Sequence, residues 1–535
     1  MGFTENGSAT FLSTGNPCLD FFFHVVPDTP PQELLQRLQL SWKRNALIIL
    51  KLICNLRGVR GIGKSQKEGF YSAALWLHKH HPTTLGDEVR MKEEKKWLKK
   101  KGKGFLEGLK EKKDSGIPKR KTNVVQWEKT LDKADKFLDR YAHDYNFHYL
   151  YEKVSGFFVD ALWEDMELYN EGRFHELSLA AKWCPSLDSS YDRSLLMCES
   201  IGRKLFPPDQ YMDLEDSHYA YRVRNSLRKE VLVPLRKVLE IPEVYICANK
   251  WEELPYKHVP SVAMRMYMNL FYKHDKKRFE QYLKDVESGK TTIAAGALLP
   301  HEIIASLQNS TGPEVAELQW NRMVDDLAKK GKLTNCMAIC DVSGSMRGTP
   351  MEVCVALGLL ISEISEEPWK GKLITFSTDP EFHIVKGKRL SQKTNFISKM
   401  NWDGSTDFQK VFDKILEVAV RGNLREEQMI KRLFVFSDMD FDQASASPWD
   451  TDYQVIRRKF KRKGYNRVPE IVFWNLRNSR ATPVPSKQQG VALESGFSKN
   501  LVTSFLEEGE ILSPEAVMMQ AISGDEYQKL VVFEL

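Results

Sequence analysis

From Asn335 to the end of the chain, short apolar runs alternate with amphipathic helical patterns, and Gly or Pro turns separate them. We expect strands at 336–341, 372–377, 381–386, 432–438, 470–476 and 490–495, and helices at 350–364, 391–400, 407–421, 451–464, 499–508 and 513–522. Such alternation is typical of α/β domains with a mainly parallel sheet. The pattern therefore predicts a doubly wound, Rossmann-type α/β domain.

Residues 124–330 show a different pattern, with apolar side chains at helical spacing and no clear alternation of period two. Val154, Phe158 and Ala161 belong to one such stretch. Pro and Gly residues recur throughout and divide the segment into short helices. We therefore expect a helical array of HEAT type, although no fixed-period repeat is visible.

The domain organisation follows from these two patterns, and the overall fold class is α + α/β. Residues 1–29 contain Gly, Ser, Thr, Asn and Pro around a few aromatic residues, which indicates an N-terminal arm that docks by its aromatics. Pro30 and Pro31 open a helix, so we place the helical-array domain at 30–330. The α/β domain then takes 331–535.

The first strand of the α/β domain runs into the sequence CDVSGSM at 340–346. Here Asp341, Ser343 and Ser345 occupy alternate positions on a strand-to-helix loop, where one carboxylate and two hydroxyls can point at one place. Hard oxygen ligands of this kind suit Mg²⁺ or Mn²⁺. The loop also lies at the carboxyl end of a strand, which is where open α/β sheets bind their ligands.

Two later segments add further oxygen ligands. Thr406 precedes the helix expected at 407–421, and Asp438 ends the strand expected at 432–438. The set Asp341, Ser343, Ser345, Thr406 and Asp438 resembles the metal-ion-dependent adhesion site (MIDAS) of von Willebrand factor A (vWA) domains, with all five positions filled in order. The resemblance implies a divalent cation with one position open to water or to a partner's carboxylate.

The match to the vWA motif has departures. The usual Thr-Asp-Gly is Ser-Asp-Met here, and the further acids Asp440 and Asp442 could alter the choice of metal or add a second cation. The alternative interpretation is that Ser343 and Ser345 cap the next helix and that Asp438 lies in a solvated turn.

Residues 58–65 satisfy the phosphate-loop pattern G-x-x-x-x-G-K-[ST]. That loop needs a strand before it, whereas the preceding segment here looks helical. We favour a Gly-rich turn between helices with Arg57, Arg60 and Lys64 exposed, over a nucleotide-binding enzyme. A third interpretation is that this basic turn contacts nucleic-acid phosphates.

Basic charge is concentrated in the first half of the chain. Residues 331–535 contain 27 Lys or Arg and 27 Asp or Glu, so the whole net charge of +6 lies in residues 1–330. Arg90 to Lys121 hold 14 basic and 5 acidic residues, with Trp97 interleaved. Such a segment is usually solvated, but it can bind nucleic acid or act as a nuclear import signal. The candidate RNA-binding residues are Arg57, Arg60, Lys64, Lys99, Lys100, Lys101, Lys119, Arg120 and Lys121.

The eight cysteines are scattered, without Cys-x-x-Cys, and no His pair has finger spacing. We therefore expect free thiols in a reducing compartment and no structural zinc site. The N-terminus has no basic segment before its apolar stretch, so we expect no secretory signal. The apolar runs are shorter than the ~18–20 residues of a membrane span. These features predict a cytoplasmic protein, with the nucleus as an alternative location.

The whole chain resembles an uncharacterised plant family with a vWA-like C-terminal domain, over nearly all of residues 16–530. That resemblance rests on 179–186 (LAAKWCPS), 295–302 (AGALLPHE), 335–360 and 406–413 (TDFQKVFD). The order of a helical array and a metal-site domain is also similar to that of Ro ribonucleoprotein (TROVE) proteins, which bind RNA on a ring of helical repeats. This second resemblance implies RNA as a partner, but no RNA-contacting residue carries over.

Three hypotheses of function remain. The first is a non-enzymatic protein that binds RNA through the helical array and a divalent cation in the vWA-like domain. The second is a metal-dependent protein–protein interaction scaffold, in which an acidic side chain of a partner completes the metal site. The third, an enzyme, is disfavoured because no Ser/His/Asp or Cys/His set stands out.

Overall fold

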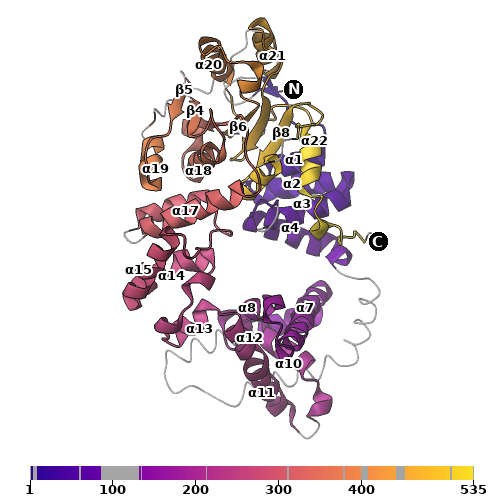
Figure 1. Cartoon of the computed structure of the whole chain (residues 1–535). Coiled ribbons are helices and arrows are strands. Elements are labelled where there is room, and N and C mark those ends of the chain that lie inside the picture. Colours follow the sequence, from indigo (N-terminus) through magenta and orange to yellow (C-terminus); the bar gives the residue numbers. More distant parts are fainter. Residues whose placement is uncertain are drawn as a thin grey trace. The chain divides into compact units, whose positions relative to one another are not determined.

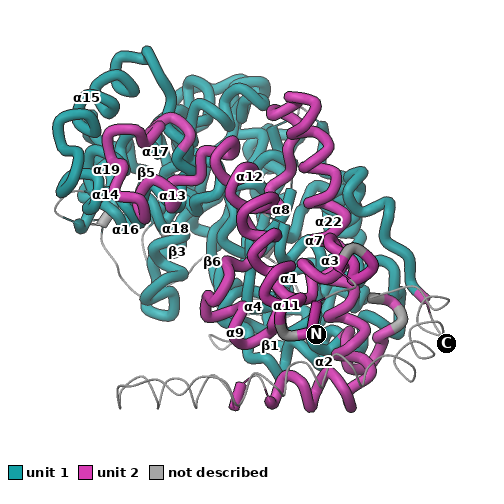
Figure 2. The backbone as a smooth tube through the Cα atoms, turned by 90° about the horizontal axis from the view of Figure 1, so that it is seen from below, with its two compact units in different colours: residues 1–76, 259–532 teal, residues 77–258, 533–535 magenta. Residues whose placement is uncertain are grey.

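The computed structural model describes the chain except for residues 1, 4–8, 59–61, 86–131, 134, 212–213, 310–311, 377–379, 399, 401–407, 442–451, 507–508 and 534–535. The chain forms two compact units, which Figure 2 shows in teal and magenta. Unit 1 comprises Met1–Trp76 and Val259–Val532, and unit 2 comprises Leu77–His258 and Phe533–Leu535.

Unit 1 is built on a six-stranded sheet whose strands neighbour one another in the order β5-β4-β3-β6-β7-β8. Figure 1 labels β5, β4, β6 and β8 of this sheet. All neighbours are parallel except β5, which runs antiparallel to β4. The central strands are almost wholly apolar and buried, as expected for a sheet with both faces covered. The strands are β3 (Cys336–Asp341), β4 (Lys372–Phe376), β5 (Glu381–Ile384), β6 (Arg432–Ser437), β7 (Glu470–Asn475) and β8 (Val491–Ser495), with a separate short pair, β1 (Gly2–Phe3) and β2 (Ala9–Thr10).

Helices cover both faces of this sheet. Val472 of β7 belongs to the same core cluster as the buried side chains of α18, whereas the next residue, Phe473, contacts Phe408 of α20 with ring centroids 5.5 Å apart. Because successive side chains of a strand point to opposite faces, α18 and α20 lie on opposite sides. The helices of this part are α14 (Ser261–His274), α15 (Lys276–Glu287), α16 (Pro300–Ala305), α17 (Gly312–Ala328), α18 (Thr349–Ile364), α19 (Leu390–Ser398), α20 (Phe408–Arg421), α21 (Asp452–Arg462) and α22 (Pro514–Ala521).

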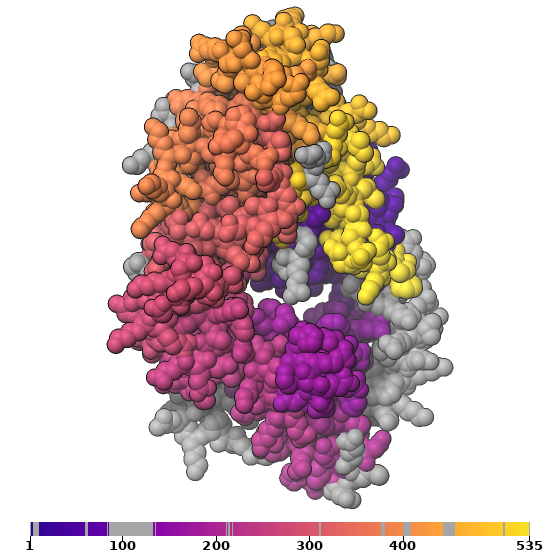
Figure 3. Space-filling model, viewed as in Figure 1, coloured from indigo at the N-terminus to yellow at the C-terminus, as the bar shows by residue number. Residues whose placement is uncertain are grey.

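The N-terminal residues belong to the same unit as the C-terminal sheet. Helix α1 (Pro17–His24) packs against β8, and its three consecutive phenylalanines are all buried. The carbonyl of Phe22 accepts a hydrogen bond from Ser495 Oγ at 2.8 Å, and that of Phe23 accepts one from Asn475 Nδ2 at 3.1 Å. Figure 3 shows the N-terminal residues, in indigo, beside the C-terminal residues, in yellow. The next helices are α2 (Pro31–Arg44), α3 (Ala46–Arg57) and α4 (Lys67–His80).

In the described residues of unit 2, the regular elements are helices. Its core joins apolar side chains of α7, α10 and α12, including Leu162, Ile201 and Leu235, which are fully buried. The helices are α7 (Tyr145–Asn170), α8 (Ala180–Trp183), α9 (Ser190–Leu195), α10 (Met197–Leu205), α11 (Asp216–Ser226), α12 (Val233–Val238) and α13 (Pro242–Cys247), and a π-helix (Leu227–Leu232) joins α11 to α12.

The expected succession of helical region and mostly parallel α/β sheet is confirmed, and each expected strand is present within one or two residues of its predicted ends. The helix expected at 499–508 is instead a 3₁₀-helix, Lys499–Phe505. The compact units do not follow the predicted boundaries at 30 and 331. The reason is that residues 17–24 and the helices α16 and α17 pack their apolar side chains onto the α/β part.

Candidate metal centre

Asp341 is the last residue of β3, and its side chain is completely buried. The backbone N–H of Ser343 donates to Asp341 Oδ1 at 2.9 Å. The hydroxyl of Ser437, the last residue of the neighbouring strand β6, donates to Asp341 Oδ2 at 2.6 Å. The carboxylate is thus held from both strand ends, and its two oxygens have different partners.

Ser343 and Ser345 lie in the tight turn that follows β3. Their hydroxyl oxygens are 2.9 Å apart, and Ser343 is buried whereas Ser345 is exposed. Ser343 is the N-cap residue of the 3₁₀ turn Gly344–Met346, but its side chain makes no capping bond there. The N-cap residue of α18 is Gly348, so neither serine caps that helix. The alternative interpretation of these two serines as helix caps is therefore wrong.

Asp438 follows β6 directly and is 2 % exposed, so it does not lie in a solvated turn. Its Oδ1 accepts a hydrogen bond from the backbone N–H of Asp440 at 3.2 Å. The intervening Met439 has φ of +68°, a left-handed conformation that is uncommon for a non-glycine residue and recurs at functional sites. The Asp438 carboxylate therefore closes its own turn through the N–H of Asp440.

The two carboxylates repel each other in a buried environment. Burial, followed by the charge of Asp438, raises the pKa of the Asp341 carboxyl to about 6, and the hydrogen bonds from Ser437 and Ser343 act against this shift. Among the residues that the structure describes, neither Asp341 nor Asp438 has an ion pair. A cation between them would supply the missing opposite charge.

Thr406, the fifth predicted ligand, lies outside the described residues, as does Asp442. In the part of the chain that the structure describes, no three His, Cys, Asp or Glu side chains gather as a metal-binding group. The donors that do gather are two carboxylates and the hydroxyls of Ser343 and Ser345. These are hard oxygen donors, which fit Mg²⁺ or Mn²⁺ rather than a softer metal.

One further acid near this site could not be found from the sequence. Asp28 lies between α1 and α2, yet the charge of Asp438 contributes to raising its pKa, after burial as the main cause. The backbone N–H of Asn478 donates to Asp28 Oδ1 at 3.0 Å and holds it after β7. No sequence pattern links residue 28 to a loop more than four hundred residues later.

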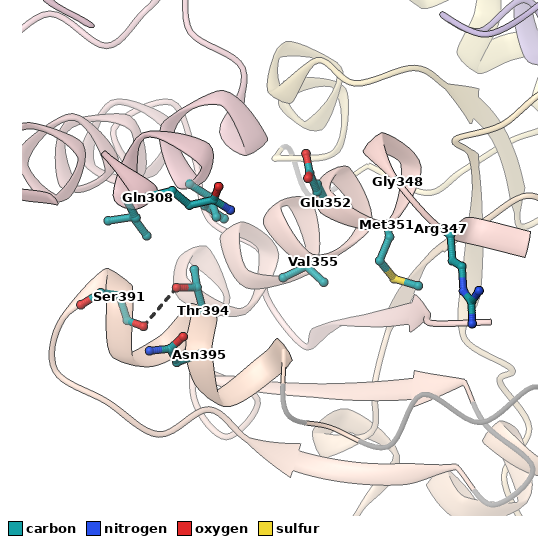
Figure 4. Close-up of a pocket in the computed structure, with 11 residues that line it drawn as sticks. Gln308, Arg347, Gly348, Met351, Glu352, Val355, Ser391, Thr394 and Asn395 are labelled. Atoms are coloured by element: carbon teal, nitrogen blue, oxygen red, sulfur yellow. Dashed lines mark hydrogen bonds between the residues drawn. The ribbon is translucent and has the colours of Figure 1, made fainter. Parts of the chain in front are cut away.

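A pocket of about 530 Å³ opens beside the turn that carries the two serines (Figure 4). Arg347 and Gly348, directly after that turn, form part of its wall. Helices α18 and α19 form other parts of the pocket wall. Both apolar and polar side chains line the pocket. The lining includes Leu307, Arg347, Met351, Glu352, Val355 and Thr394.

The phosphate-loop pattern at 58–65 lies between helices α3 and α4, as expected. The N–H groups of Lys64, Ser65 and Gln66 donate to the carbonyls of Asn55, Gly58 and Leu56, so these three amides are not available to a phosphate. The expectation that Lys64 is exposed is wrong. Lys64 is 2 % exposed, and its Nζ donates to the carbonyl of Phe22 and to Ser495 Oγ.

Of the candidate RNA-binding residues, Arg57 and Lys64 are the two that the structure describes. Arg57 is half-buried at the end of α3. Lys64 is buried and faces the sheet rather than solvent. The remaining candidates lie outside the described residues: Arg60, Lys99, Lys100, Lys101, Lys119, Arg120 and Lys121.

Among the described residues, no helix is both long and apolar enough to span a bilayer.

Comparisons with known proteins place the chain among families whose function is not known. Residues 335–531 match a domain of unknown function, DUF7788, and residues 4–91 and 86–333 match a second, DUF2828. "Uncharacterized protein L728" of Acanthamoeba polyphaga mimivirus is 27 % identical over 548 residues, which cover 98 % of this chain and 87 % of the viral protein. These matches name neither a plant source, nor a metal, nor RNA. Because the DUF2828 matches span more than half of its length, the chain belongs to the DUF2828 family.

Proposed function

We propose that unit 1 is a vWA-like domain that holds a divalent cation, Mg²⁺ or Mn²⁺, and that the protein is a cation-dependent binding protein rather than an enzyme. One observation carries this proposal. Asp341 and Asp438 lie buried at the ends of two adjacent parallel strands, without an ion pair among the described residues. Two buried carboxylates repel each other, and a bound cation would stabilise their ionised forms.

The topology of the sheet supports the same conclusion. In sequence order the strands stand 3-2-1-4-5-6, which is the order of doubly wound sheets. The order reverses between β3 and β6, and ligands of such sheets bind outside the carboxyl ends of the strands at this reversal. Asp341 and Asp438 lie on the two sides of it.

The residues that would hold the cation are Asp341, Ser343, Ser345 and Asp438, with Thr406 as a fifth ligand that rests on the sequence motif alone. Ser345 is the exposed member, so the side of the site next to it faces outward. A cation there would keep one position for an outside ligand. An acidic side chain of a partner protein fits that position, which makes a metal-dependent protein–protein interaction scaffold our preferred form of the proposal.

The neighbouring pocket supports a protein ligand. Arg347 and Glu352 stand at its wall together with Met351 and Val355. A peptide that places a carboxylate at the cation could place its next side chains here, where both apolar surface and charges are present. RNA binding by the helical region remains a separate proposal, and it rests on Arg90 to Lys121, which lie outside the described residues.

The experiment is a calorimetric titration of the full chain with Mn²⁺. We expect saturable binding by the wild type and none by Asp341→Asn or Asp438→Asn, because each change removes one of the two buried charges and keeps the side-chain shape. Asp413→Asn, on the surface of α20, is the control and should bind as the wild type does. Circular dichroism verifies that the variants are folded. Undiminished Mn²⁺ binding by both site variants would disprove the proposal.

A further inference from the structure

The helix α21 and the turn after it form the most one-sided charge cluster in the described part of the α/β region. Between residues 453 and 469 the sequence has seven Lys or Arg and no Asp or Glu. The equal totals of acids and bases over 331–535 conceal this cluster. We define the α21 basic face by its exposed side chains: Arg457, Arg458, Lys461, Arg462, Lys463 and Arg467.

The apolar side of α21 fixes this face in place. Ile456 and Phe460 are fully buried, and the Phe460 ring packs on Phe412 of α20 with centroids 6.0 Å apart. After the helix, Gly464 takes φ of +87°, and the N–H of Tyr465 bonds back to the carbonyl of Phe460. This is a Schellman-type end, so the cations stand on a rigid helix and a locked turn rather than on a loose loop.

Some cations on other helices of unit 1 have an acidic partner on their own helix. Lys276 of α15 pairs with Glu280, and Arg322 of α17 pairs with Asp326. On α21, Lys459 lies at the edge of the basic face and pairs with Asp413 of α20 at 2.8 Å. Among the described residues, Arg457, Lys461, Arg462, Lys463 and Arg467 have no ion pair through their side chains.

The spacing of the unpaired cations suits a repeating anion. Residues four apart on a helix lie on the same side about 6 Å apart along the axis, so Arg457 and Lys461 form one row, and Arg462 and Lys463 continue the surface. Arg also presents a planar fork that binds phosphate oxygens in pairs. A chain of phosphates is therefore a better match than an isolated anion.

The same face is poorly suited to a membrane. Helices that lie in a bilayer surface insert apolar or aromatic side chains between the lipids. Within residues 455–467 of the described structure, no large apolar side chain is exposed, because those of α21 point into the unit. The face offers charge without an insertable group.

We propose that the α21 basic face binds the phosphate backbone of a single-stranded nucleic acid, without reading its bases. This inference goes beyond the cation site and does not depend on it. The contacts are electrostatic, and binding releases counterions from the nucleic acid. Added salt makes this release less favourable, so the affinity falls steeply as the salt concentration rises. Five contacting cations predict a log–log slope of about −3.5, or an affinity that falls roughly 100-fold between about 50 and 200 mM salt.

The test measures fluorescence anisotropy of labelled oligo-uridylate and oligo-thymidylate with the full-length protein, in EDTA so that the cation site plays no part. We expect both to bind the wild type. The triple variant Arg457→Gln, Lys461→Gln, Arg462→Gln should bind more weakly, with the slope reduced to about −1.4. Arg457→Lys with Arg462→Lys keeps the charge and should retain most of the affinity.

The matched control is the triple variant Lys276→Gln, Arg278→Gln, Lys284→Gln on α15, which removes three charges from another helix of the same unit and should bind as the wild type does. The proposal is overturned if the α21 triple variant binds the oligonucleotides as tightly as this control does. It is also overturned if the wild type binds neither oligonucleotide at low salt. Binding of phosphatidylserine vesicles or polyglutamate, but of neither oligonucleotide, would also overturn it in favour of a membrane or an acidic protein.

Discussion

Ser437 Oγ donates a hydrogen bond of 2.6 Å to Asp341 Oδ2, across the point where the strand order of the sheet reverses. Ser437 is itself fully buried and also accepts a hydrogen bond from the backbone N–H of Met439 at 3.0 Å. One hydroxyl therefore holds both the carboxylate that ends β3 and the turn that carries Asp438. Ser437 is not among the predicted ligands, but its hydroxyl contacts one of them and the turn that carries another.

Replacing this hydroxyl should lower stability while preserving cation binding. In Ser437→Ala, Asp341 Oδ2 and the N–H of Met439 each lose a partner in a buried place, which costs about 1–3 kcal/mol of unfolding free energy. Urea denaturation measures this cost, and calorimetry with Mn²⁺ should still show binding. Ser362→Ala is the control, because Ser362 is equally buried but donates only to a carbonyl of its own helix. Equal stability of the two variants would contradict the positioning role of Ser437.

A second prediction concerns the discontinuous unit. The C-terminal region 331–535 alone should not unfold cooperatively, because it lacks α1, whose Phe21, Phe22 and Phe23 each contribute about 1.5–3 kcal/mol by burial. Asn55 Nδ2 from α3 also donates to the carbonyl of Ala521 in α22 at 3.1 Å. Thermal unfolding followed by circular dichroism tests this fragment.

The matched control is a fusion protein that joins residues 1–76 to 259–535 through a flexible linker of about 20 Gly and Ser residues, which restores every segment of unit 1. This fusion should unfold cooperatively. If the fragment 331–535 alone melts as sharply as the fusion, the N-terminal residues are not an essential part of the unit.

The sheet could be predicted because buried parallel strands are nearly continuous apolar runs. Cys336 to Asp341 and Arg432 to Ser437 are of this kind, and each carries its acid at or just after its end. Spacing alone suggested that Asp341, Ser343 and Ser345 lie close together, and the described contacts join them: the N–H of Ser343 bonds to Asp341, and the hydroxyls of Ser343 and Ser345 are 2.9 Å apart.

The burial of Lys64 and the position of Asp28 could not be predicted, because both depend on contacts between residues far apart in the chain, which no local pattern encodes. Lys64 fits a motif of exposed phosphate-binding lysines, but here its burial follows from the approach of α1 and β8. Asp28 approaches the loop after β7 for a similar reason. The charge totals of residues 331–535 do not reveal the basic face of α21, because acids and bases cancel over that length whereas a surface patch depends on charge within a few turns.

A third prediction concerns Lys64. Equilibrium dialysis should find no saturable binding of ATP or GTP by the wild type, because three amides of the turn already donate to carbonyls of the chain. Lys64→Met should instead lower stability by about 1–3 kcal/mol, since it removes a buried donor to Phe22 and Ser495. Lys67→Met, at an exposed position of α4, is the control and should be nearly neutral. Nucleotide binding that Lys64→Met eliminates would contradict this assignment.

The last prediction concerns the contribution of Glu494 to the pH dependence of stability. Its carboxyl is fully buried on β8, and among the described residues no side chain donates a hydrogen bond to either oxygen. Burial raises the pKa of Glu494 to about 8, although Lys64 acts in the opposite direction. Burial likewise lowers the pKa of Lys64 to about 7, partly offset by Glu494.

The sign follows from proton binding. Between pH 4.5 and 8 the folded protein keeps the Glu494 proton and the unfolded chain does not, so stability falls as pH rises through this window. Below pH 7, Lys64 is protonated in both states and contributes no slope. From about pH 5 to 7, the wild type should therefore lose up to about 1.4 kcal/mol per pH unit relative to Glu494→Gln.

Urea denaturation at several pH values tests this difference, and the comparison between variants cancels groups that titrate in both proteins. Two such groups are His24, whose pKa burial lowers to about 3 and which acts with the opposite sign, and Asp341, whose pKa burial raises to about 6 and which acts with the same sign as Glu494. Glu287→Gln, at an exposed position of α15, should follow the wild type at every pH. If Glu494→Gln shows the wild-type slope between pH 5 and 7, the Glu494 carboxyl is ionised in the folded protein and Lys64 is its charged partner.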